Sequence, residues 1–465
     1  MTQVSPAPYA GTSRSGWVGR TFTAATAALL SLSLAVPAQA QGKAAVVRDA
    51  EIETLLKDYA TPVLKAAGLK ASRVQIVLVN DPSFNAFVDG QRIFINTGAL
   101  SASTVPNEII GVIAHEAGHL AGGHQQRLRE QIATAQTLAI VGGLLGAGAI
   151  AAGSIAGSEN GAQVGGALIT ATPTLVQRNL LSYRRSEEMN ADQAAARFLN
   201  ATGQSMQGML TTFQRFSQSL SLSGVQVDQY QISHPLPRER IALLEELARK
   251  SKFFDTRDPQ SLVDRHQLMR AKVAAYSGGA AAVVRLFSKD RGSLAARYGD
   301  AIATDLSGNS AAALKKMDAL IREQPGNPYF HEFRGEILIK LRKSDEAIKA
   351  FAQAVKLDRT KSPLIRARLG FALVASGKKG NMNRAIEELR VAIQADPDNF
   401  NAYRNLSQAY GQAGDIANAE LIMAEGNFRA GNPREAKVFA ARALQKLPKG
   451  SPGAIRANDI LTIGK

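Results

Sequence analysis

The sequence contains no cysteine. This absence excludes disulfide frameworks, thiolate metal sites, cysteine nucleophiles and a lipid anchor on an N-terminal cysteine. Histidine is also scarce, since the chain has six and three of them lie between positions 115 and 124. We therefore expect any metal or acid–base chemistry to depend on this short segment and on carboxylates.

The composition excludes wholesale disorder, collagen and a polytopic membrane protein, because hydrophobic residues make up 45% and charged residues 20% of the chain. The 465 residues predict two or three domains. Charge is distributed unevenly: residues 41–250 hold 18 basic and 17 acidic side chains, whereas residues 251–465 hold 35 and 22. The resulting net charge of +13 on the second half favours anionic partners.

The first 40 residues have the features of a secretory signal peptide. Arg14 and Arg20 precede an apolar run over residues 22–36, which is followed by Ala38-Gln39-Ala40. A positive n-region, a short apolar h-region and an A-x-A site predict cleavage after Ala40. The run is too short and too rich in serine and threonine for a membrane anchor. We therefore expect a soluble protein in a bacterial periplasm, where nucleic acid is not a partner.

A helix predicted over residues 107–127 carries the clearest chemical motif, His115-Glu116-Ala117-Gly118-His119. At about 100° per residue, His115 and His119 lie one turn apart on one face, where both imidazoles can bind one ion. Glu116 projects close by and can take a proton from a metal-activated water. This H-E-x-x-H pattern indicates a metallopeptidase, although so short a pattern also occurs by chance.

A third ligand is predicted further along the chain, in residues 184–192. Glu188 and Asp192 are four residues apart and share one face of the predicted helix. Glu188 can complete a His/His/Glu site that leaves a fourth position for water, and Asp192 can accept a hydrogen bond from a ligating imidazole. Glu187 could be the third ligand instead. Alternatively, both glutamates could lie on a solvent-exposed acidic helix face and bind no metal. The spacing to Asp192 favours Glu188.

His124 is a candidate for a supporting role. It follows His115 by nine residues, so a continuous helix aims it away from the metal. A break at Gly122-Gly123 would change that direction. We expect a second-shell or structural role for His124 rather than ligation.

The remaining histidines are less clearly placed by the residues alone. His234 lies in a proline-rich loop and could be a fourth metal ligand or bind the oxyanion of a tetrahedral intermediate, and Arg240 could do the latter too. An exposed loop histidine is the favoured interpretation at this point. His266 and His331 have no chemical neighbours in the sequence and are predicted to lie on the surface.

Several segments occur together in an order that resembles the HtpX-like zinc metallopeptidases, which are gluzincins related to the CAAX prenyl proteases. They are residues 108–124, Arg185-x-x-Glu188-x-x-Ala191-Asp192, Ser233-His234-Pro235 and residues 85–98. The resemblance covers about residues 45–250. One departure is Arg184, where that family often has serine, and it affects no catalytic position.

The resemblance implies one Zn²⁺ per chain, whose ligands would be His115, His119 and Glu188. It further implies Glu116 as the catalytic base and Asp192 as a residue that orients a ligand. It also changes the interpretation of the proline-rich loop, because it makes His234 and Arg240 active-site residues.

Between the two motifs lies a Gly/Ala-rich insert over residues 132–180. Residues 138–157 are almost wholly Ala, Gly, Ile, Leu and Val, a length and composition that could pass for a transmembrane helix. Seven of these twenty residues are Gly or Ser, which weakens the drive for insertion. We expect a mobile hairpin that covers the cleft or touches the membrane surface, with a true span as the alternative.

The second half has a repeat near the 34-residue length of a tetratricopeptide unit. Ala313, Ala347, Ala385 and Ala419 are separated by 34, 38 and 34 residues, and the extra residues of the longer spacing fall in a loop at 377–381. Such repeats stack into a superhelix with a concave groove for a polypeptide partner. An ordinary helical bundle is the less favoured alternative.

The predicted fold is an α+β zincin-like (gluzincin) metallopeptidase domain over 41–255, a helical linker over 256–290 and an all-α tetratricopeptide-like superhelix over 291–465. This combination resembles BepA-type periplasmic proteases, which implies as partners unfolded or assembling outer-membrane proteins, their assembly machinery and an anionic membrane surface. The predicted function is a zinc endopeptidase acting on misfolded or stalled outer-membrane proteins. The alternative is a chaperone or adaptor with a latent, self-capped zinc site.

Overall fold

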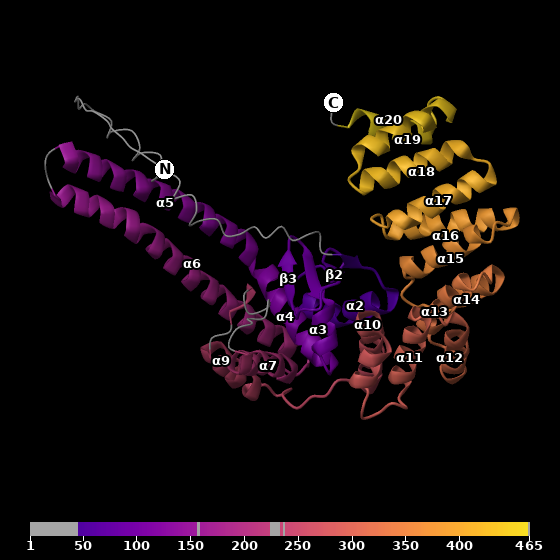
Figure 1. The fold of residues 1–465 in the computed structure, drawn as a ribbon, viewed down its shortest axis with the longest axis horizontal. Helices are drawn as coiled ribbons and strands as arrows, with labels where there is room; N and C mark the ends of the chain where they lie inside the picture. The colour runs from indigo at the N-terminus through magenta and orange to yellow at the C-terminus, as the bar shows by residue number, and fades with distance from the viewer. Residues whose placement is uncertain (1–44, 156–158, 224–232, 236–237, 464–465) are drawn as a thin grey trace, which may run out of the picture. The chain divides into compact units, whose positions relative to one another are not determined.

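The computed structural model describes residues 45–155, 159–223, 233–235 and 238–463 (Figure 1). The predicted signal peptide at 1–40 lies outside these residues. The described chain has an α+β region followed by a long array of helices, as the sequence predicts.

A small mixed sheet forms one layer of the first region. Its strands are β1 (Val46–Val47), β2 (Gln75–Val79), β3 (Ala86–Asp89) and β4 (Arg92–Asn96). They are arranged in the order β1-β2-β4-β3, with β2 and β4 parallel and the outer pairs antiparallel. The alternation of strand β4 buries Ile93 and Ile95 completely in the core. The strands predicted at 74–79 and 92–96 are therefore confirmed.

Several described helices accompany the sheet in the first region, besides α5 (His124–Ile155) of the insert. They are α2 (Ala50–Ala66), α3 (Thr97–Ala102), α4 (Pro106–Gly122), α6 (Glu159–Ala201), α7 (Gln207–Ser223) and α9 (Arg238–Lys250). Helix α4 is central, since every residue from Pro106 to His119 is buried. Proline at its first position suits a helix start, and Gly123 ends it with the left-handed φ of 64°.

Helix α4 approaches helix α6 closely because a glycine lies at their contact. A Cβ atom on Gly118 would lie 2.8 Å from the carbonyl oxygen of Ala191, which is closer than real Cβ atoms come. Ala191 is adjacent to Asp192 and less than one turn from Glu188. The absence of a side chain at position 118 therefore sets how near the carboxylates of α6 come to the histidines of α4.

The Gly/Ala-rich insert is helical where it is described. Helix α5 (His124–Ile155) and the first part of α6 pack against each other as two arms on either side of residues 156–158 (Figure 1). By length and composition, one described helix segment, His124–Ala152, could cross a membrane.

The second region consists of antiparallel helix pairs. They comprise α10 (Gln260–Leu286), α11 (Leu294–Leu306), α12 (Ser310–Glu323), α13 (Pro328–Lys340), α14 (Ser344–Leu357), α15 (Pro363–Ala375), α16 (Met382–Ala395), α17 (Phe400–Ala413), α18 (Ile416–Arg429), α19 (Pro433–Lys446) and α20 (Pro452–Thr462). The four periodic alanines are all buried, and Gly335 lies against the ring of Phe351. A 3₁₀ turn at Lys379–Asn381 accommodates the longer spacing. The prediction of tetratricopeptide-like repeats is confirmed.

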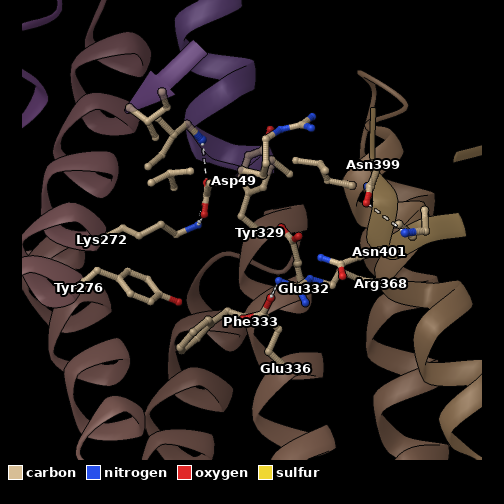
Figure 2. A pocket seen from close by; sticks show the side chains of 18 of the residues that line it. Asp49, Lys272, Tyr276, Tyr329, Glu332, Phe333, Glu336, Arg368, Asn399 and Asn401 are labelled. Atoms are coloured by element: carbon tan, nitrogen blue, oxygen red, sulfur yellow. Dashed lines mark hydrogen bonds and ion pairs between the residues drawn. The ribbon is translucent and has the colours of Figure 1, made fainter. Parts of the chain in front are cut away.

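Helix α10 belongs to the cores on both of its sides rather than serving as a plain linker. Met269 and Val273 pack in the core of the first region, whereas Leu268 and Ala271 pack with the first repeat helices. Buried Lys272 pairs with Asp49 at 2.9 Å, a contact drawn in Figure 2. A cavity of about 840 Å³ lies here, lined by α10, the repeat helices α13, α15 and α17, and residues 47–50.

Gly118→Ala tests the close approach of α4 and α6. We expect the added methyl group to overpack this contact and to lower the free energy of unfolding by about 1–3 kcal/mol. Gly148→Ala on α5 is the matched control, because a Cβ there meets nothing within 4 Å. Chemical denaturation of both variants measures the difference, and equal stability of the two would contradict the assigned packing.

Candidate metal centre

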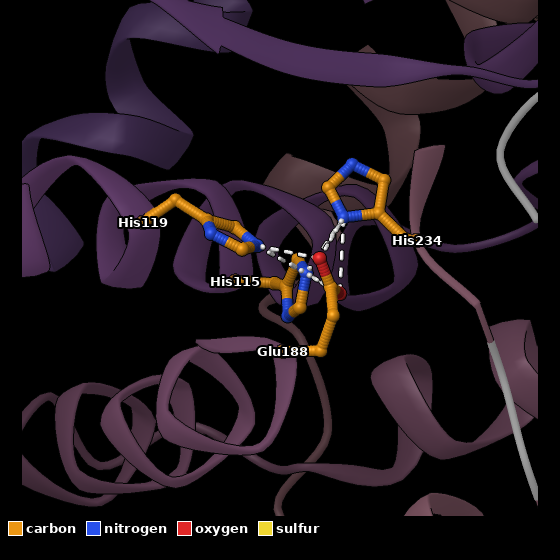
Figure 3. A group of neighbouring side chains, drawn as sticks. All are labelled: His115, His119, Glu188 and His234. Carbon is orange, nitrogen blue, oxygen red and sulfur yellow. Dashed lines mark hydrogen bonds and ion pairs between the residues drawn. The ribbon is translucent and has the colours of Figure 1, made fainter. Parts of the chain in front are cut away.

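Four potential metal ligands converge in the first region (Figure 3). His115 and His119 come from α4, Glu188 comes from α6, and His234 comes from the short segment before α9. All four are buried, and one ligand atom from each lies within 4.8 Å of the others. Residues distant in the sequence thus present three nitrogens and a carboxylate to a single point.

The spacing of these atoms fits a tetrahedral zinc site. His115 Nε2 is 3.1 Å from His119 Nε2, 3.3 Å from His234 Nδ1 and 3.3 Å from Glu188 Oε2. Glu188 Oε1 is 3.4 Å from His119 Nε2, and its Oε2 is 3.1 Å from His234 Nδ1. A tetrahedron with ligand bonds of about 2.0–2.1 Å has edges of about 3.3–3.4 Å. Imidazole and carboxylate are also the donors that zinc commonly takes.

His234 takes the fourth corner of this tetrahedron. A catalytic zinc site keeps one corner open for water or substrate, whereas a site with four protein ligands is closed. The imidazole of His234 also lies beside Glu116, with its Nε2 3.5 Å from Glu116 Oε1. The exposed loop histidine favoured by the residues alone is therefore wrong, since His234 is buried at 6% exposure.

Glu116 is fully buried next to this cluster. Within the described part of the chain, neither of its carboxylate oxygens accepts a hydrogen bond. Burial of a carboxylate without hydrogen bonds is costly, so it marks a place where a polar ligand belongs. The structure thus puts a carboxylate without a hydrogen bond beside the imidazole of His234 and on the residue next to His115.

The carboxylate of Asp192 contacts His115 on the side of the ring that faces away from the other ligands. Its Nδ1 lies 2.8 Å from Asp192 Oδ1, the arrangement that fixes the tautomer and leaves Nε2 directed at the metal position. Burial alone would lower the pKa of His115, but the hydrogen bonds to Asp192 and Glu188 outweigh it and raise that pKa to about 10. The carboxylates therefore make this corner of the site strongly attractive to a cation.

A separate series of polar contacts fixes the imidazole of His119. Its Nδ1 lies 2.9 Å from Nδ1 of His124, whose Nε2 lies 2.9 Å from Glu187 Oε2. Arg127 donates to the same Glu187 oxygen at 2.8 Å. Helix α4 ends at Gly122 and α5 starts at His124, so the break at the glycine pair turns His124 back toward the site. Glu187, the rival third ligand, is engaged in this chain and not with the other ligand atoms.

Burial tends to keep the imidazoles of His119 and His124 neutral. It lowers the pKa of His119, and it lowers the pKa of His124 to about 4. A neutral imidazole is the form that binds a metal ion. The two histidines of α4 thus differ, because His115 contacts the carboxylates of Asp192 and Glu188, whereas His119 contacts Glu188 and the imidazole of His124.

Two arginines hold the segment that carries His234. Arg240 donates two hydrogen bonds to Asp192, at 2.8 and 2.9 Å, and a third to the carbonyl of Pro235 at 2.6 Å. Its Nη1 also lies 3.0 Å from Glu188 Oε2. Arg184 donates to the carbonyl of Ser233 at 3.0 Å. The guanidinium of Arg240 is therefore directed at the carboxylates and the loop, not at an oxyanion position as the sequence suggested.

The position of His266 differs from the prediction, and several residues that support the site were not predicted. His266 is fully buried, with Nδ1 3.0 Å from the Tyr59 hydroxyl and Nε2 3.1 Å from the carbonyl of Ser103, so its predicted surface position is wrong. Arg127 and Arg184 were not recognised, although the departure at position 184 was a usable signal. No local pattern links either arginine to the motif.

Glu188→Gln and Glu187→Gln form a matched pair that tests the ligand set. We expect the first to lose nearly all bound zinc, because it replaces an anionic ligand in a buried site by a neutral amide. The second should retain zinc, because the polar contacts of Glu187 among the described residues are with His124 and Arg127 and not with a ligand atom. Metal content of the purified proteins by mass spectrometry measures both. Equal zinc content would contradict the geometry.

Comparison with known proteins agrees with this site. A model described as peptidase family M48 matches residues 47–248, and a tetratricopeptide repeat model matches residues 307–362. The chain is similar to the "Beta-barrel assembly-enhancing protease" of Escherichia coli (strain K12), at 23% identity over 89% of this chain and 83% of that protein. The protein of that name from Yersinia pestis is 24% identical over 70% of this chain and 65% of its own length. A "Putative beta-barrel assembly-enhancing protease" of Vibrio cholerae is 24% identical over 87% and 82%. Residues 47–248 therefore belong to the zinc metallopeptidases of peptidase family M48, and they precede a tetratricopeptide repeat region.

Proposed function

We propose that the chain is a zinc-dependent endopeptidase that is held in a latent state by His234. One observation carries the proposal. Four ligand atoms have the spacing of a zinc tetrahedron, and the imidazole of His234 also lies 3.5 Å from Glu116, a buried carboxylate without a hydrogen bond among the described residues. A binding protein or adaptor has no need of such a base.

Each residue of the site has a distinct role in the proposed hydrolysis. One zinc ion held by His115, His119 and Glu188 would polarise the scissile carbonyl and lower the pKa of water. Glu116 accepts a proton from the attacking water and returns it to the nitrogen of the leaving amine. Asp192 keeps Nε2 of His115 directed inward, and His124 does the same for His119.

His234 limits this chemistry in the described conformation. Its imidazole fills the corner that substrate or water needs, and its Nε2 also lies 3.3 Å from the carbonyl of Ala86 on β3. Activity therefore requires the 233–235 segment to move. After such a movement, His234 is the remaining candidate to bind the oxyanion, since Arg240 is occupied by Asp192 and Glu188.

The names of the relatives support a proposal for the substrate and the compartment. Their printed names describe a protease that enhances β-barrel assembly, so we propose misfolded or stalled outer-membrane proteins in the periplasm as substrates. The cavity of Figure 2 supports recruitment by the repeats, because aromatic rings, amides and the Arg368 guanidinium line it, among them Tyr276, Phe333, Asn399 and Asn401. Its mixed polarity and its lining by repeat helices suit a polypeptide partner.

The alternative is a chaperone or adaptor whose zinc site stays latent. The fourth corner occupied by His234 favours it, because a closed zinc site is typical of a structural role. The unpartnered Glu116 favours the enzyme. One chain can have both roles. A variant that lacks only the proposed base, Glu116, distinguishes proteolysis from the adaptor role.

Glu116→Gln removes the base while keeping its shape. We expect degradation of an unfolded outer-membrane protein to fall by about 100-fold or more with zinc content unchanged. Time courses followed on gels, with zinc measured in the same samples, test this expectation. Equal degradation by both forms would refute the peptidase, and a variant that still promotes β-barrel assembly in cells would support the adaptor.

His234→Asn and Arg184→Ser test the latent state. The first opens the fourth corner, and the second releases the carbonyl of Ser233 without touching a ligand. We expect both to increase the binding of a small hydroxamate, and Arg184→Ser to increase the initial rate of proteolysis as well. Arg178→Ser is the matched control on the same helix. Unchanged hydroxamate binding in both variants would show that His234 does not close the site.

A further inference from the structure

The insert is almost free of charge over a long stretch. Between Glu130 and Arg178 the sequence has one charged residue, Glu159. Helix α5 passes through this stretch, and only 11% of the most apolar window of its His124–Ala152 segment is buried. A surface of this kind is costly in water, and a helix that is apolar on all sides belongs in a core or in a membrane.

Helix α5 buries small residues at its contact with α6, whereas the large side chains exposed along it from Leu138 to Leu145 are apolar. Ala139 and Gly146 are buried in the interface with α6, whereas Ile140, Leu144 and Leu145 are 62%, 69% and 64% exposed. Water-soluble helix pairs place large apolar side chains between the helices. Small residues at the helix contact with large apolar ones outside are typical of helices packed in lipid.

Cations cluster where the charge-free stretch ends. Arg127 and Arg129 lie on the first turns of α5, and Arg178 and Arg185 lie on the part of α6 that runs beside them. Arg129, Arg178 and Arg185 are exposed. Arginines at the end of an apolar helix commonly sit among phosphate head groups.

We propose that the α5–α6 hairpin inserts into a lipid bilayer that contains anionic lipids. The apolar part of α5 from Leu138 to Ile155 is about 27 Å long at 1.5 Å per residue, against about 30 Å for a hydrocarbon core. The outward leucines and isoleucine enter the acyl chains, and Arg178 and Arg185, exposed at the base of the hairpin, bind phosphates. This placement does not depend on peptidase activity.

The distribution of the apolar side chains favours a bilayer over a second copy of the chain. Leu138, Ile140, Val141, Leu144 and Leu145 are all exposed and spread over roughly 160° of the helix circumference, at about 100° per residue. A helix that pairs with one partner helix buries a narrower stripe. Lipid surrounds a hairpin on every outward side, and the adjoining arginines match anionic head groups.

A site-specific probe tests insertion in the full chain. Because the chain has no cysteine, Leu145→Cys labelled with an environment-sensitive fluorophore reports on one position. Ile455→Cys, 56% exposed on α20, is the matched control for a similarly exposed apolar side chain. With vesicles of phosphatidylethanolamine and phosphatidylglycerol, we expect a blue shift and quenching by brominated acyl chains at 145 and neither at 455.

Two double variants separate the contributions of the apolar surface and the arginines. Leu144→Asn with Leu145→Asn should lower vesicle partitioning roughly tenfold or more, whereas Val438→Asn with Ile455→Asn should leave it unchanged. Arg178→Gln with Arg185→Gln should reduce partitioning to anionic vesicles toward that to phosphatidylcholine vesicles. Unchanged zinc content verifies that the variants are folded.

Contrary results have definite meanings. No response of the probe at 145, or equal partitioning of the two apolar double variants, would overturn the proposal. A concentration-dependent dimer in light scattering that the Leu144/Leu145 double variant abolishes, together with an unresponsive probe, would assign the surface to a second copy instead.

Discussion

The contact between α4 and α6 is the constraint on which the metal centre depends. The H-E-x-x-H motif supplies two imidazoles from one helix, but a metal also needs the carboxylate from a helix far along the chain. Gly118 lets the backbone of Ala191 come within a distance that any side chain would prevent. That approach brings Glu188 to 3.3–3.4 Å from the Nε2 atoms of His115 and His119, and Asp192 to 2.8 Å from Nδ1 of His115.

The charges gathered by this contact are buried, so each of them needs a partner. Burial would raise the pKa of Glu188, but His234, His115 and His119 together hold it well below its usual range. Burial has the same effect on Asp192, where His115 and Arg240 lower the pKa. Breaking a buried pair typically costs about 3–5 kcal/mol because it strands a charge. Glu116 differs from these two carboxylates, because neither of its oxygens accepts a hydrogen bond among the described residues and the nearest imidazole nitrogen, Nε2 of His234, is 3.5 Å away.

The same contacts connect the site to two peripheral segments. Arg184 and Arg240 hold the carbonyls on both sides of His234, so the helix that supplies Glu188 also holds the residue that fills the fourth corner. On the other side, His124, Glu187 and Arg127 join His119 to the base of the α5–α6 hairpin. A hairpin anchored in lipid would thus be continuous with the metal ligands through a short series of hydrogen bonds. The segment that carries His234 and the α5–α6 hairpin are thus both connected by hydrogen bonds to ligands of the same metal centre.

The amino-acid sequence by itself determined the features that depend on local spacing. Residues four apart share a helix face, so His115 with His119, and Glu188 with Asp192, were recognisable from periodicity, as were the strands at 74–79 and 92–96 and the repeating alanines. Tertiary structure decided the rest. The fourth corner at His234, the separate partners of Glu187 and Glu188, and the burial of His266 against Tyr59 all join segments distant in the chain. No periodicity encodes such contacts, because a loop's path and a helix's approach are fixed by packing against the whole core rather than by neighbouring residues.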